Sequence, residues 1–298
     1  MNYIQKMIQD ICKEENIQFH LVSKDWIMVL EKNLKRHFIV GYKFELNDHA
    51  AGLICDDKYA LFDVLKLHDL PVCEHYIFFK NYDREEVKDY FLKCKRHVVL
   101  KINDGTCGIG VYSITDLEPL YERMDSLFLK HYSVSISPFY EIKNEYRTIL
   151  LDGEVALFYG KKRPIVVGDG VHTIYQLLCE FNPNYFLKLE EHSELDKVLV
   201  KEEVFEYGWQ HNLSKGSVPF LVADKKLEKK IQRIASEVMN YLSLRFASVD
   251  IIELENGELL VLEVNSGVMM ENYAQIMNEE DTCREIYRKA ILKMFDEN

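Results

Sequence analysis

Three oxygen-bearing side chains, those of Asp250, Glu263 and Asn265, lie in a short stretch near the end of the sequence. Two apolar runs carry them, and Asn256-Gly257 between the runs is typical of a two-residue β-hairpin turn. Because side chains alternate along a strand, Glu263 and Asn265 face the same side, and Asp250 can join them from the neighbouring strand. Oxygen ligands of this kind suit Mg²⁺. An exposed acidic hairpin edge without function is the alternative interpretation.

A glycine-rich segment follows the lysine that ends the apolar run 97–101, which is Lys101. It contains Gly105, Gly108 and Gly110 and leads into a second apolar run. Glycines let backbone N–H groups approach phosphate oxygens with no Cβ in the way, and a nearby lysine adds positive charge. The spacing is not that of a Walker loop. A tight β-turn that requires positive φ angles explains the same glycines.

Composition restricts the class of protein. The chain has 298 residues and a formal net charge of −12, which argues against sequence-independent binding to nucleic acid or to an anionic membrane. Its 7 cysteines show no CxxC pair and no zinc-ligand spacing, as is typical of reduced thiols. We find no signal-peptide pattern and no apolar run that could span a bilayer. We therefore expect a cytoplasmic protein of two or three packed lobes.

Hydrophobic periodicity indicates the elements that position these residues. Helices are expected over 59–68, 83–94, 118–123, 174–180, 225–241 and 281–295. Strands are expected over 18–22, 26–31, 37–44, 97–101, 111–114, 127–129, 148–151, 155–159 and 204–210, besides the two runs of the C-terminal hairpin. Pro138 within the run 133–142 indicates an edge strand or a hinge. Residues 1–57 form a small N-terminal α/β lobe in this interpretation.

A second hairpin is expected around Asp152-Gly153. It is followed by three consecutive cations, Lys161, Lys162 and Arg163. A run of this kind in an acidic protein is usually a solvated surface, and the alternative is a surface that faces a polyanion.

The order of these features resembles the ATP-grasp superfamily of carboxylate–amine ligases. The matching positions are Lys58, Lys101 with its glycine loop, an aromatic hinge, Glu145, Arg163, Asn212, Asp250 and Glu263-x-Asn265. The match covers residues 57–298. The stretch EYRTILLDGEVALFYGKKRPIVVGDGVHTIYQLL and the loop NLSKGS are most similar to the ATP-grasp region of cyanophycin synthetase and of glutamate- and glutathione-type ligases.

The resemblance implies an α+β ATP-grasp fold, in which two α+β subdomains grip ATP. The first subdomain would comprise residues 58–136 and carry the lid. The second would comprise residues 137–298 and carry the catalytic metal site. The N-terminal lobe 1–57 would precede both.

The resemblance also implies nucleotide-binding roles. Lys101 would contact the adenine or the α-phosphate, and Lys58 would make an additional phosphate or ribose contact. The hinge Phe139-Tyr140 would offer backbone groups to the adenine, and Glu145 would bind the ribose hydroxyls. The loop over the β- and γ-phosphates would include Gly105, Thr106, Gly108 and Gly110.

The metal and catalytic roles follow from the same resemblance. Asp250, Glu263 and Asn265 would hold Mg²⁺, with Mn²⁺ as the alternative ion, and Glu263 would bridge two ions. Arg163 and Arg147 would stabilise the transferred phosphoryl group or the substrate carboxylate. Asn212 would line the acyl site.

The expected activity is ATP-dependent formation of an amide bond between small amino-acid-like substrates through an acyl phosphate, with release of ADP and phosphate. The expected partners are small-molecule carboxylates and amines, amino acids or short peptides, with a homodimer as the compatible assembly. Two other functions remain open at this stage. One is an ATP-binding regulatory module without turnover, and the other is a small-molecule kinase on the same fold.

Overall fold

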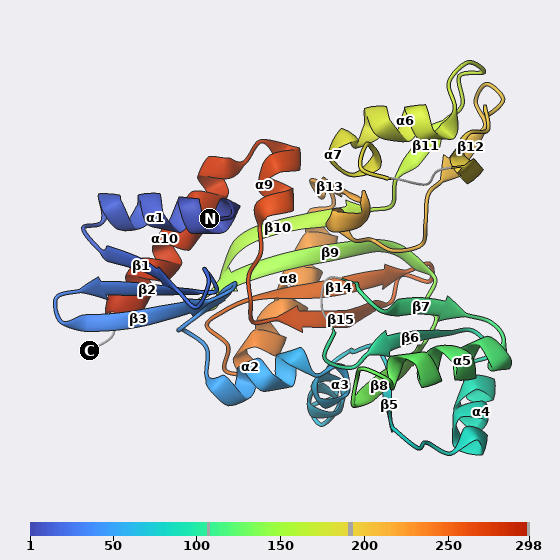
Figure 1. Cartoon of the computed structure of the whole chain (residues 1–298), viewed down its shortest axis with the longest axis horizontal. Coiled ribbons are helices and arrows are strands. Elements are labelled where there is room, and N and C mark those ends of the chain that lie inside the picture. The colour runs from blue at the N-terminus through green and yellow to red at the C-terminus, as the bar shows by residue number, and fades with distance from the viewer. Residues whose placement is uncertain (106–107, 190–192, 297–298) are drawn as a thin grey trace.

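The computed structural model describes residues 1–105, 108–189 and 193–296. At its centre lies a five-stranded antiparallel sheet with the strand order β13-β10-β9-β14-β15 (Figure 1). These strands span Val218–Phe220 (β13), Glu154–Lys162 (β10), Ile142–Leu151 (β9), Phe246–Leu254 (β14) and Leu259–Asn265 (β15). Antiparallel neighbouring strands can be joined by tight hairpin turns.

Two such turns set the register of the central sheet. Gly153 between β9 and β10 and Gly257 between β14 and β15 both have a φ angle of +81°. Glycine adopts this left-handed conformation at low steric cost. The first turn brings Leu151 opposite Glu154. Both hairpins expected from the sequence are confirmed.

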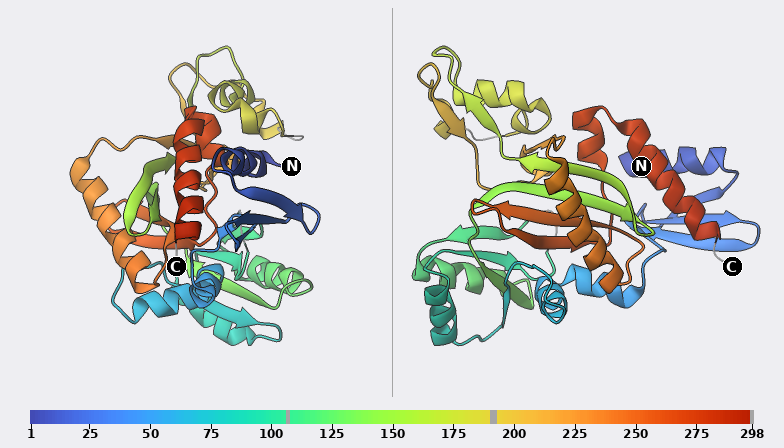
Figure 2. Two further views of the ribbon diagram at one scale, coloured as in Figure 1. Left: turned by 90° about the vertical axis from the view of Figure 1, so that its left-hand side faces the viewer. Right: turned by 180° about the vertical axis from the view of Figure 1, so that it is seen from behind.

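One face of the central sheet is covered by α8 (Lys225–Tyr241), which crosses the strands in Figure 2. Asp224 caps this helix by accepting hydrogen bonds from two backbone N–H groups of its first turn. Its buried stripe includes Ile231 and Val238, which share one apolar core with Val249 of β14 and Val264 of β15. The helix predicted over 225–241 is confirmed. The opposite face of the sheet carries the polar residues described below.

The N-terminal lobe pairs α1 (Tyr3–Glu14) with a four-stranded antiparallel meander. Its strands are β1 (Gln18–Val22), β2 (Ile27–Lys32), β3 (Lys35–Val40) and β4 (Lys43–Phe44). The strand expected over 37–44 is interrupted at Gly41, which has a φ angle of +60°. Helices α9 (Glu271–Met277) and α10 (Glu280–Asp296), from the other end of the chain, complete the core of this lobe.

A second four-stranded sheet, with the order β5-β8-β6-β7, forms a separate layer with its own core. Its strands are β5 (Tyr76–Phe79), β6 (Val98–Ile102), β7 (Val111–Ile114) and β8 (Ser133–Pro138). Helices α4 (Arg84–Lys93) and α5 (Leu117–Leu127) cover one side of it, as Figure 1 shows. Helices α2 (His49–Asp56) and α3 (Lys58–Lys66) connect it to the N-terminal lobe.

Two sequence interpretations in this second sheet were wrong. The segment 127–129, expected as a strand, contains the end of α5 and its cap, because the amphipathic helix continues beyond residue 123. Pro138 was expected to mark an edge strand or a hinge, and the edge position is wrong because β8 lies between β5 and β6. Pro138 is tolerated there because it is the last residue of the strand, opposite Val98, where the ladder ends.

A small unit projects from the chain between β10 and β13, at the upper right of Figure 1. It contains β11 (Ile165–Val167), β12 (Val204–Glu206), α6 (Ile174–Phe181), α7 (Pro183–Phe186) and the short 3₁₀ turn Ser193–Leu195. A second 3₁₀ turn, Leu213–Lys215, follows the unit, and Leu213 packs against the core of the N-terminal lobe. The projecting unit has its own apolar core around Leu178 and Phe186. Within the described ranges, none of the helices has the length and apolar composition needed to cross a membrane.

Candidate functional site

A cavity of about 670 Å³ lies where the three larger parts of the molecule meet. The central sheet contributes its polar face, the second sheet contributes Lys101 and the glycine-rich segment, and the N-terminal lobe contributes the segment from Val40 to Lys43. Segments far apart in the sequence therefore surround one volume.

The middle of the cavity is formed by a row of four residues that lie opposite one another across four strands. Tyr159 of β10 pairs with Arg147 of β9, Arg147 pairs with Asp250 of β14, and Asp250 pairs with Glu263 of β15. Residues directly opposite in an antiparallel sheet point to the same face. All four side chains line the cavity. The expectation that Asp250 and Glu263 share a face is confirmed.

Asp250 is held by two cations. The Arg147 guanidinium donates from Nε to Oδ1 at 2.8 Å and from Nη2 to Oδ2 at 2.5 Å, and Lys161 Nζ donates to Oδ1 at 3.3 Å. Only 2% of Asp250 is exposed. Burial raises the pKa of this carboxyl, but Arg147 and Lys161 outweigh that effect and lower the pKa to about 2. Asp250 is therefore an anion at neutral pH and a poor proton acceptor.

Lys161 is a buried cation between two carboxylates. Only 3% of it is exposed, and it forms ion pairs with Glu145 and with Asp250. Burial lowers its pKa, but the two anions outweigh burial and raise it above the ordinary lysine value. Burial likewise raises the pKa of Glu145. The adjacent Lys162 points the other way and lies over the ring of Phe220 at 5.1 Å, so alternation along β10 divides the cationic run between two faces.

A β-bulge increases the number of side chains that β15 presents to the cavity. The register shifts between Asp250 and Ile251, so that Leu262 is the extra residue on β15. Leu262 and the adjacent Glu263 both line the cavity, although neighbours in a regular strand point to opposite faces. Asn265 lies opposite Ser248 and also lines the cavity, which confirms the expected shared face of Glu263 and Asn265.

The predicted metal ligands are two carboxylates and an amide, Asp250, Glu263 and Asn265. Among the described residues, no cluster of three or more His, Cys, Asp or Glu side chains is arranged for a metal ion. Glu263 has no hydrogen-bond or ion-pair partner within the described part of the chain, and Nδ2 of Asn265 is buried without one. The Glu263 carboxylate, with Asp250 opposite and Oδ1 of Asn265 as a third oxygen, fits Mg²⁺, which needs only one or two protein carboxylates. The amide nitrogen of Asn265 is a donor and would not be a ligand.

One end of the cavity is apolar. It is lined by Val99, Phe139, Tyr140, Ile142 and Leu262. The backbone N–H of Phe139 donates to the carbonyl of His97 at 3.0 Å, so an adenine at the hinge would contact the backbone groups that follow. The Phe139 ring stacks on His97 at 3.8 Å and meets the indole of Trp209 at 5.7 Å. Phe139, His97 and Trp209 thus form an aromatic cluster at this end of the cavity.

Lys58 and Lys101 lie beside this end, near the glycine-rich segment. Lys58 Nζ donates to the carbonyls of Asn103 at 3.2 Å and Gly105 at 2.5 Å, so it fixes the start of that segment. Burial lowers the pKa of both lysines. Gly105 lines the cavity along with both lysines.

The remaining predicted loop residues differ in position. Gly108 lines the cavity, whereas Gly110 is not among the lining residues. A Cβ on Gly110 would lie 2.4 Å from Cδ1 of Ile102, so its role in the fold is close packing. Thr106 lies outside the described residues.

The loop that contains Asn212 reaches across the cavity to the glycine-rich segment. Lys215 Nζ donates to the carbonyl of Gly108 at 3.0 Å and to Oε1 of Gln210 at 2.8 Å. Asn212 lines the cavity, and its Oδ1 accepts from the backbone N–H of Ser214 at 2.9 Å. The two loops therefore touch over the cavity, although about a hundred residues separate them in the sequence.

Arg163 is not brought to the cavity wall. Its Nη2 lies 2.8 Å from Glu206 on the small projecting unit, and it is absent from the lining residues. Sequence reasoning also did not assign Lys161, Tyr159, His211 or Trp209, all of which line the cavity. Of these four residues, only Lys161 could have been predicted from a sequence pattern, the run of three cations. The others depend on strand register and loop docking.

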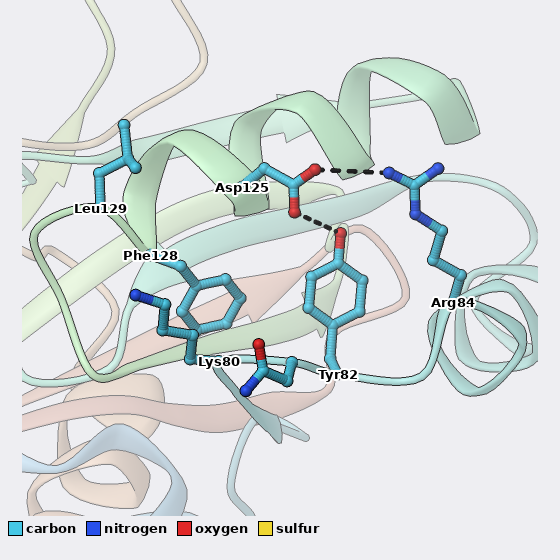
Figure 3. Close-up of a pocket in the computed structure, with 7 residues that line it drawn as sticks. Lys80, Tyr82, Arg84, Asp125, Phe128 and Leu129 are labelled. Atoms are coloured by element: carbon cyan, nitrogen blue, oxygen red, sulfur yellow. Dashed lines mark hydrogen bonds and ion pairs between the residues drawn. The ribbon is translucent and has the colours of Figure 1, made fainter.

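A smaller hollow of about 240 Å³ lies between the segment that joins β5 to α4 and the C-terminal end of α5. Three of its polar side chains are paired with one another, because Asp125 accepts from the hydroxyl of Tyr82 at 3.0 Å and from Arg84 at 3.4 Å (Figure 3). This mutual pairing leaves the large cavity as the candidate site.

Comparison with known proteins agrees with this geometry. No protein-family model matches the chain. The chain is 22% identical over 249 residues to the glutathione biosynthesis bifunctional protein GshAB of Streptococcus agalactiae serotype V, covering 72% of this chain and 32% of the relative. It is 24% identical over 216 residues to a D-alanine–D-alanine ligase of Finegoldia magna, covering 72% and 51%. The chain thus spans about a third to a half of the length of these curated relatives.

Among solved structures, the chain is similar to a bifunctional glutathione synthetase from Pasteurella multocida, with a TM-score of 0.55 at 17% sequence identity. That match covers 89% of this chain and 40% of the other. At this identity the likeness shows the fold alone. The resemblance to ATP-grasp ligases and the α+β ATP-grasp fold expected from the sequence are confirmed.

Proposed function

We propose that the protein is an ATP-dependent carboxylate–amine ligase that joins small amino-acid-like substrates. The observation that supports this most directly is the row Arg147–Asp250–Glu263 across three strands, facing one cavity with an apolar end. A transferred phosphoryl group needs cations and a metal site on one side, and a planar base needs an apolar slot on the other. One continuous cavity here offers both.

The nucleotide would occupy the cavity from the apolar end toward the charged row. Its adenine would lie between the hinge Phe139-Tyr140 and Leu262, with Lys101 at its α-phosphate. The backbone of the glycine-rich segment would cover the β- and γ-phosphates, as the contact from Lys215 to Gly108 supports. Glu145 is already paired with Lys161. Its predicted ribose contact would therefore use a carboxylate oriented by that lysine.

Asp250, Glu263 and Asn265 would hold Mg²⁺, or Mn²⁺ in its place. The ion, when bound, would neutralise phosphate charge that otherwise repels an attacking carboxylate. Arg147 would contribute positive charge at the γ-phosphate and keep Asp250 ionised for the metal. Arg163 would reach substrate only if the projecting unit moved, so Arg147 carries the arginine role in this proposal.

The proposed reaction has two steps. A carboxylate oxygen attacks the γ-phosphorus, the bond to the bridging oxygen breaks, and ADP leaves with that electron pair. An amine that has lost one proton to solvent then attacks the carbonyl carbon of the acyl phosphate. The carbon–oxygen bond to phosphate breaks, and the second proton from nitrogen leaves with inorganic phosphate. The two loops over the cavity would exclude water, which would otherwise hydrolyse the acyl phosphate.

The test is a screen of paired carboxylic acids and amines with the full chain, ATP and Mg²⁺. Release of both ADP and phosphate is measured, and mass spectrometry identifies an amide. ADP release with a stable phosphoester and no free phosphate would indicate a kinase. Nucleotide binding without ADP release in any mixture would indicate a regulatory module. Either result would overturn the proposed ligase.

A further inference from the structure

The N-terminal lobe forms the wall of the cavity at the end opposite its apolar end. Trp26, Val40 and Tyr42 supply this wall, and Leu213 and Met269 continue it. Trp26 is 60% exposed and Val40 is 38% exposed, although both are large apolar side chains. An indole left open at the mouth of a cavity is a ready surface for a ligand, because aromatic rings supply much contact area at low entropic cost.

The wall is fixed to the central sheet beside the charged row. Oδ1 of Asn47 accepts from the N–H groups of Arg245 and Phe246, at 2.8 and 2.9 Å, and Nδ2 donates to the Phe246 carbonyl at 2.6 Å. The N–H of Val268 donates to the carbonyl of Tyr42 at 3.1 Å, just beyond the end of β15. The lobe is therefore held against the strands that carry Asp250 and Asn265.

The position of the indole is set by a glycine. Gly41 has a φ angle of +60°, and a Cβ there would lie 2.9 Å from Cη2 of Trp26. The N–H of Gly41 also donates to the carbonyl of Trp26 at 3.1 Å. The ring rests on the Gly41 backbone, which holds it in place while much of its surface stays exposed. This arrangement resembles a preformed contact surface rather than a side chain that folds away.

The charged groups next to this wall are already engaged. Lys43 forms an ion pair with Asp56, and Glu271 accepts from the hydroxyl of Tyr42 at 3.0 Å and from the N–H of Ile4 at 3.1 Å. A ligand at the wall would therefore be recognised by apolar contact more than by charge. This indicates the chemical class of what binds there.

We propose that the Trp26 wall is the side-chain subsite for the amine substrate, and that it selects amines with an apolar or aromatic substituent. The inference rests on the proposed ligase function. The carboxylate must lie beside the γ-phosphate at Arg147 and Glu263, so the amine approaches its carbonyl from the side away from the nucleotide. That side is the one closed by Trp26, Val40 and Tyr42.

The chain offers a direct test because it has only two tryptophans, Trp26 and Trp209. Trp209 lies by the hinge at the nucleotide end. The variant W209F leaves Trp26 as the sole indole, and its fluorescence is titrated with glycine, leucine and phenylalanine in the presence of Mg²⁺ and a non-hydrolysable ATP analogue. We expect leucine and phenylalanine to change the emission at concentrations about tenfold or more below glycine, as hydrophobic pockets discriminate on this scale.

A response to glycine equal to that for leucine and phenylalanine, or no saturable response to any of them, would overturn the inference. The reciprocal variant W26F keeps Trp209, whose emission is titrated with the ATP analogue alone. A nucleotide response there, combined with no amine response in W209F, removes the subsite and leaves the ligase proposal intact. Absence of a nucleotide response in W26F would count against the ligase proposal itself, and the subsite would fall with it because the inference rests on that function.

The kinetic counterpart uses W26A with the amine found in the substrate screen. Loss of the indole is expected to raise KM for an apolar amine about tenfold and to change KM for glycine by less than about twofold, with kcat retained. Thermal unfolding of W26A, compared with the parent chain, separates this effect from misfolding. An equal rise in KM for both amines would contradict selection by the indole.

Discussion

Arg147 and Asp250 lie opposite each other on β9 and β14 and are joined by two hydrogen bonds, Nε to Oδ1 at 2.8 Å and Nη2 to Oδ2 at 2.5 Å. The Asp250 side chain is 3% exposed and the Arg147 side chain is 17% exposed, so the buried carboxylate depends on the guanidinium for its charge. The same pair lies next to Glu263, at the point where the proposed phosphoryl transfer occurs. Stability and proposed chemistry therefore share these two residues.

Arg147→Ala is expected to lower the free energy of unfolding by about 3 kcal/mol, because it leaves the Asp250 carboxylate buried with one weaker partner. Urea unfolding followed by circular dichroism measures the effect. The matched control is Arg233→Ala on α8, which breaks an exposed pair with Glu237 and should cost less than about 1 kcal/mol. Equal losses in the two variants would mean that the buried pair contributes no more than a surface pair.

Glu263→Gln is expected to reduce amide formation at least about a hundredfold while leaving thermal stability within about 1 kcal/mol of the parent chain. The reason is that Glu263 has no hydrogen-bond or ion-pair partner in the described part of the chain. It acts only at a longer range on Lys58 and Lys101, so its charge is available to a ligand. The control is Glu255→Gln, an exposed carboxylate on the same hairpin. Chelation of divalent ions by EDTA should reduce amide formation by the parent chain as Glu263→Gln does, whereas Glu255→Gln should leave amide formation unchanged. Full activity of Glu263→Gln would refute the metal assignment.

The sequence predicted the part of the site that local rules determine. The turn Asn256-Gly257 fixes which residues of β14 and β15 face each other, and alternation then places Glu263 and Asn265 on one face. The bulge that also turns Leu262 into the cavity has no local signal. It depends on how β15 pairs with β14, where two residues of β15 lie opposite a single step of β14.

Contacts between distant segments could not be predicted in the same way. The pairing of Lys161 with Glu145 depends on the register of β10 against β9, which the spacing of cations does not specify. The wall formed by Trp26 depends on Asn47, which binds the backbone of β14 about 200 residues away. Arg163 lies outside the cavity lining because it pairs with Glu206 in the projecting unit. Each of these is decided by tertiary packing.

His211 is expected to make the fold sensitive to acid. It is 4% exposed, its Nδ1 has no hydrogen-bond partner, and burial, with Arg163 and Lys161 nearby, lowers its pKa to about 3. Below the ordinary histidine pKa of about 6.5, this imidazole binds a proton in the unfolded chain but not in the folded chain. The free energy of unfolding therefore falls as pH falls toward 3. At pH 5 the loss from this residue amounts to roughly 2 kcal/mol.

His211→Gln should remove that part of the pH dependence. Urea unfolding is measured between about pH 7.5 and about pH 5, the range in which the histidine of the unfolded chain titrates. The free energy of unfolding is expected to decline less in the variant than in the parent chain. The control is His20→Gln, whose imidazole is exposed on β1, and which should decline like the parent chain. Parallel curves for the parent chain and His211→Gln would contradict a neutral, buried His211.

Lys215 is expected to control access to the cavity through its hydrogen bond to the Gly108 carbonyl at 3.0 Å. A hydrogen bond of this type contributes about 1 kcal/mol, so Lys215→Ala should raise the open fraction of the two loops about fivefold. Hydrogen exchange of the peptide that contains Gly108 should accelerate accordingly. The proposed acyl phosphate would then meet water more often, and phosphate release without amide formation should rise relative to ligation.

The control for this variant is Lys197→Ala, which removes an exposed lysine paired with Glu203 on the projecting unit, away from the glycine-rich segment. It should change neither exchange at Gly108 nor the ratio of phosphate to amide. Lys215→Arg keeps a donor at the tip and is expected to restore most of the protection. If Lys215→Ala left both readouts unchanged, the contact between the two loops would be incidental to closure, and water would have to be excluded from the cavity by other residues.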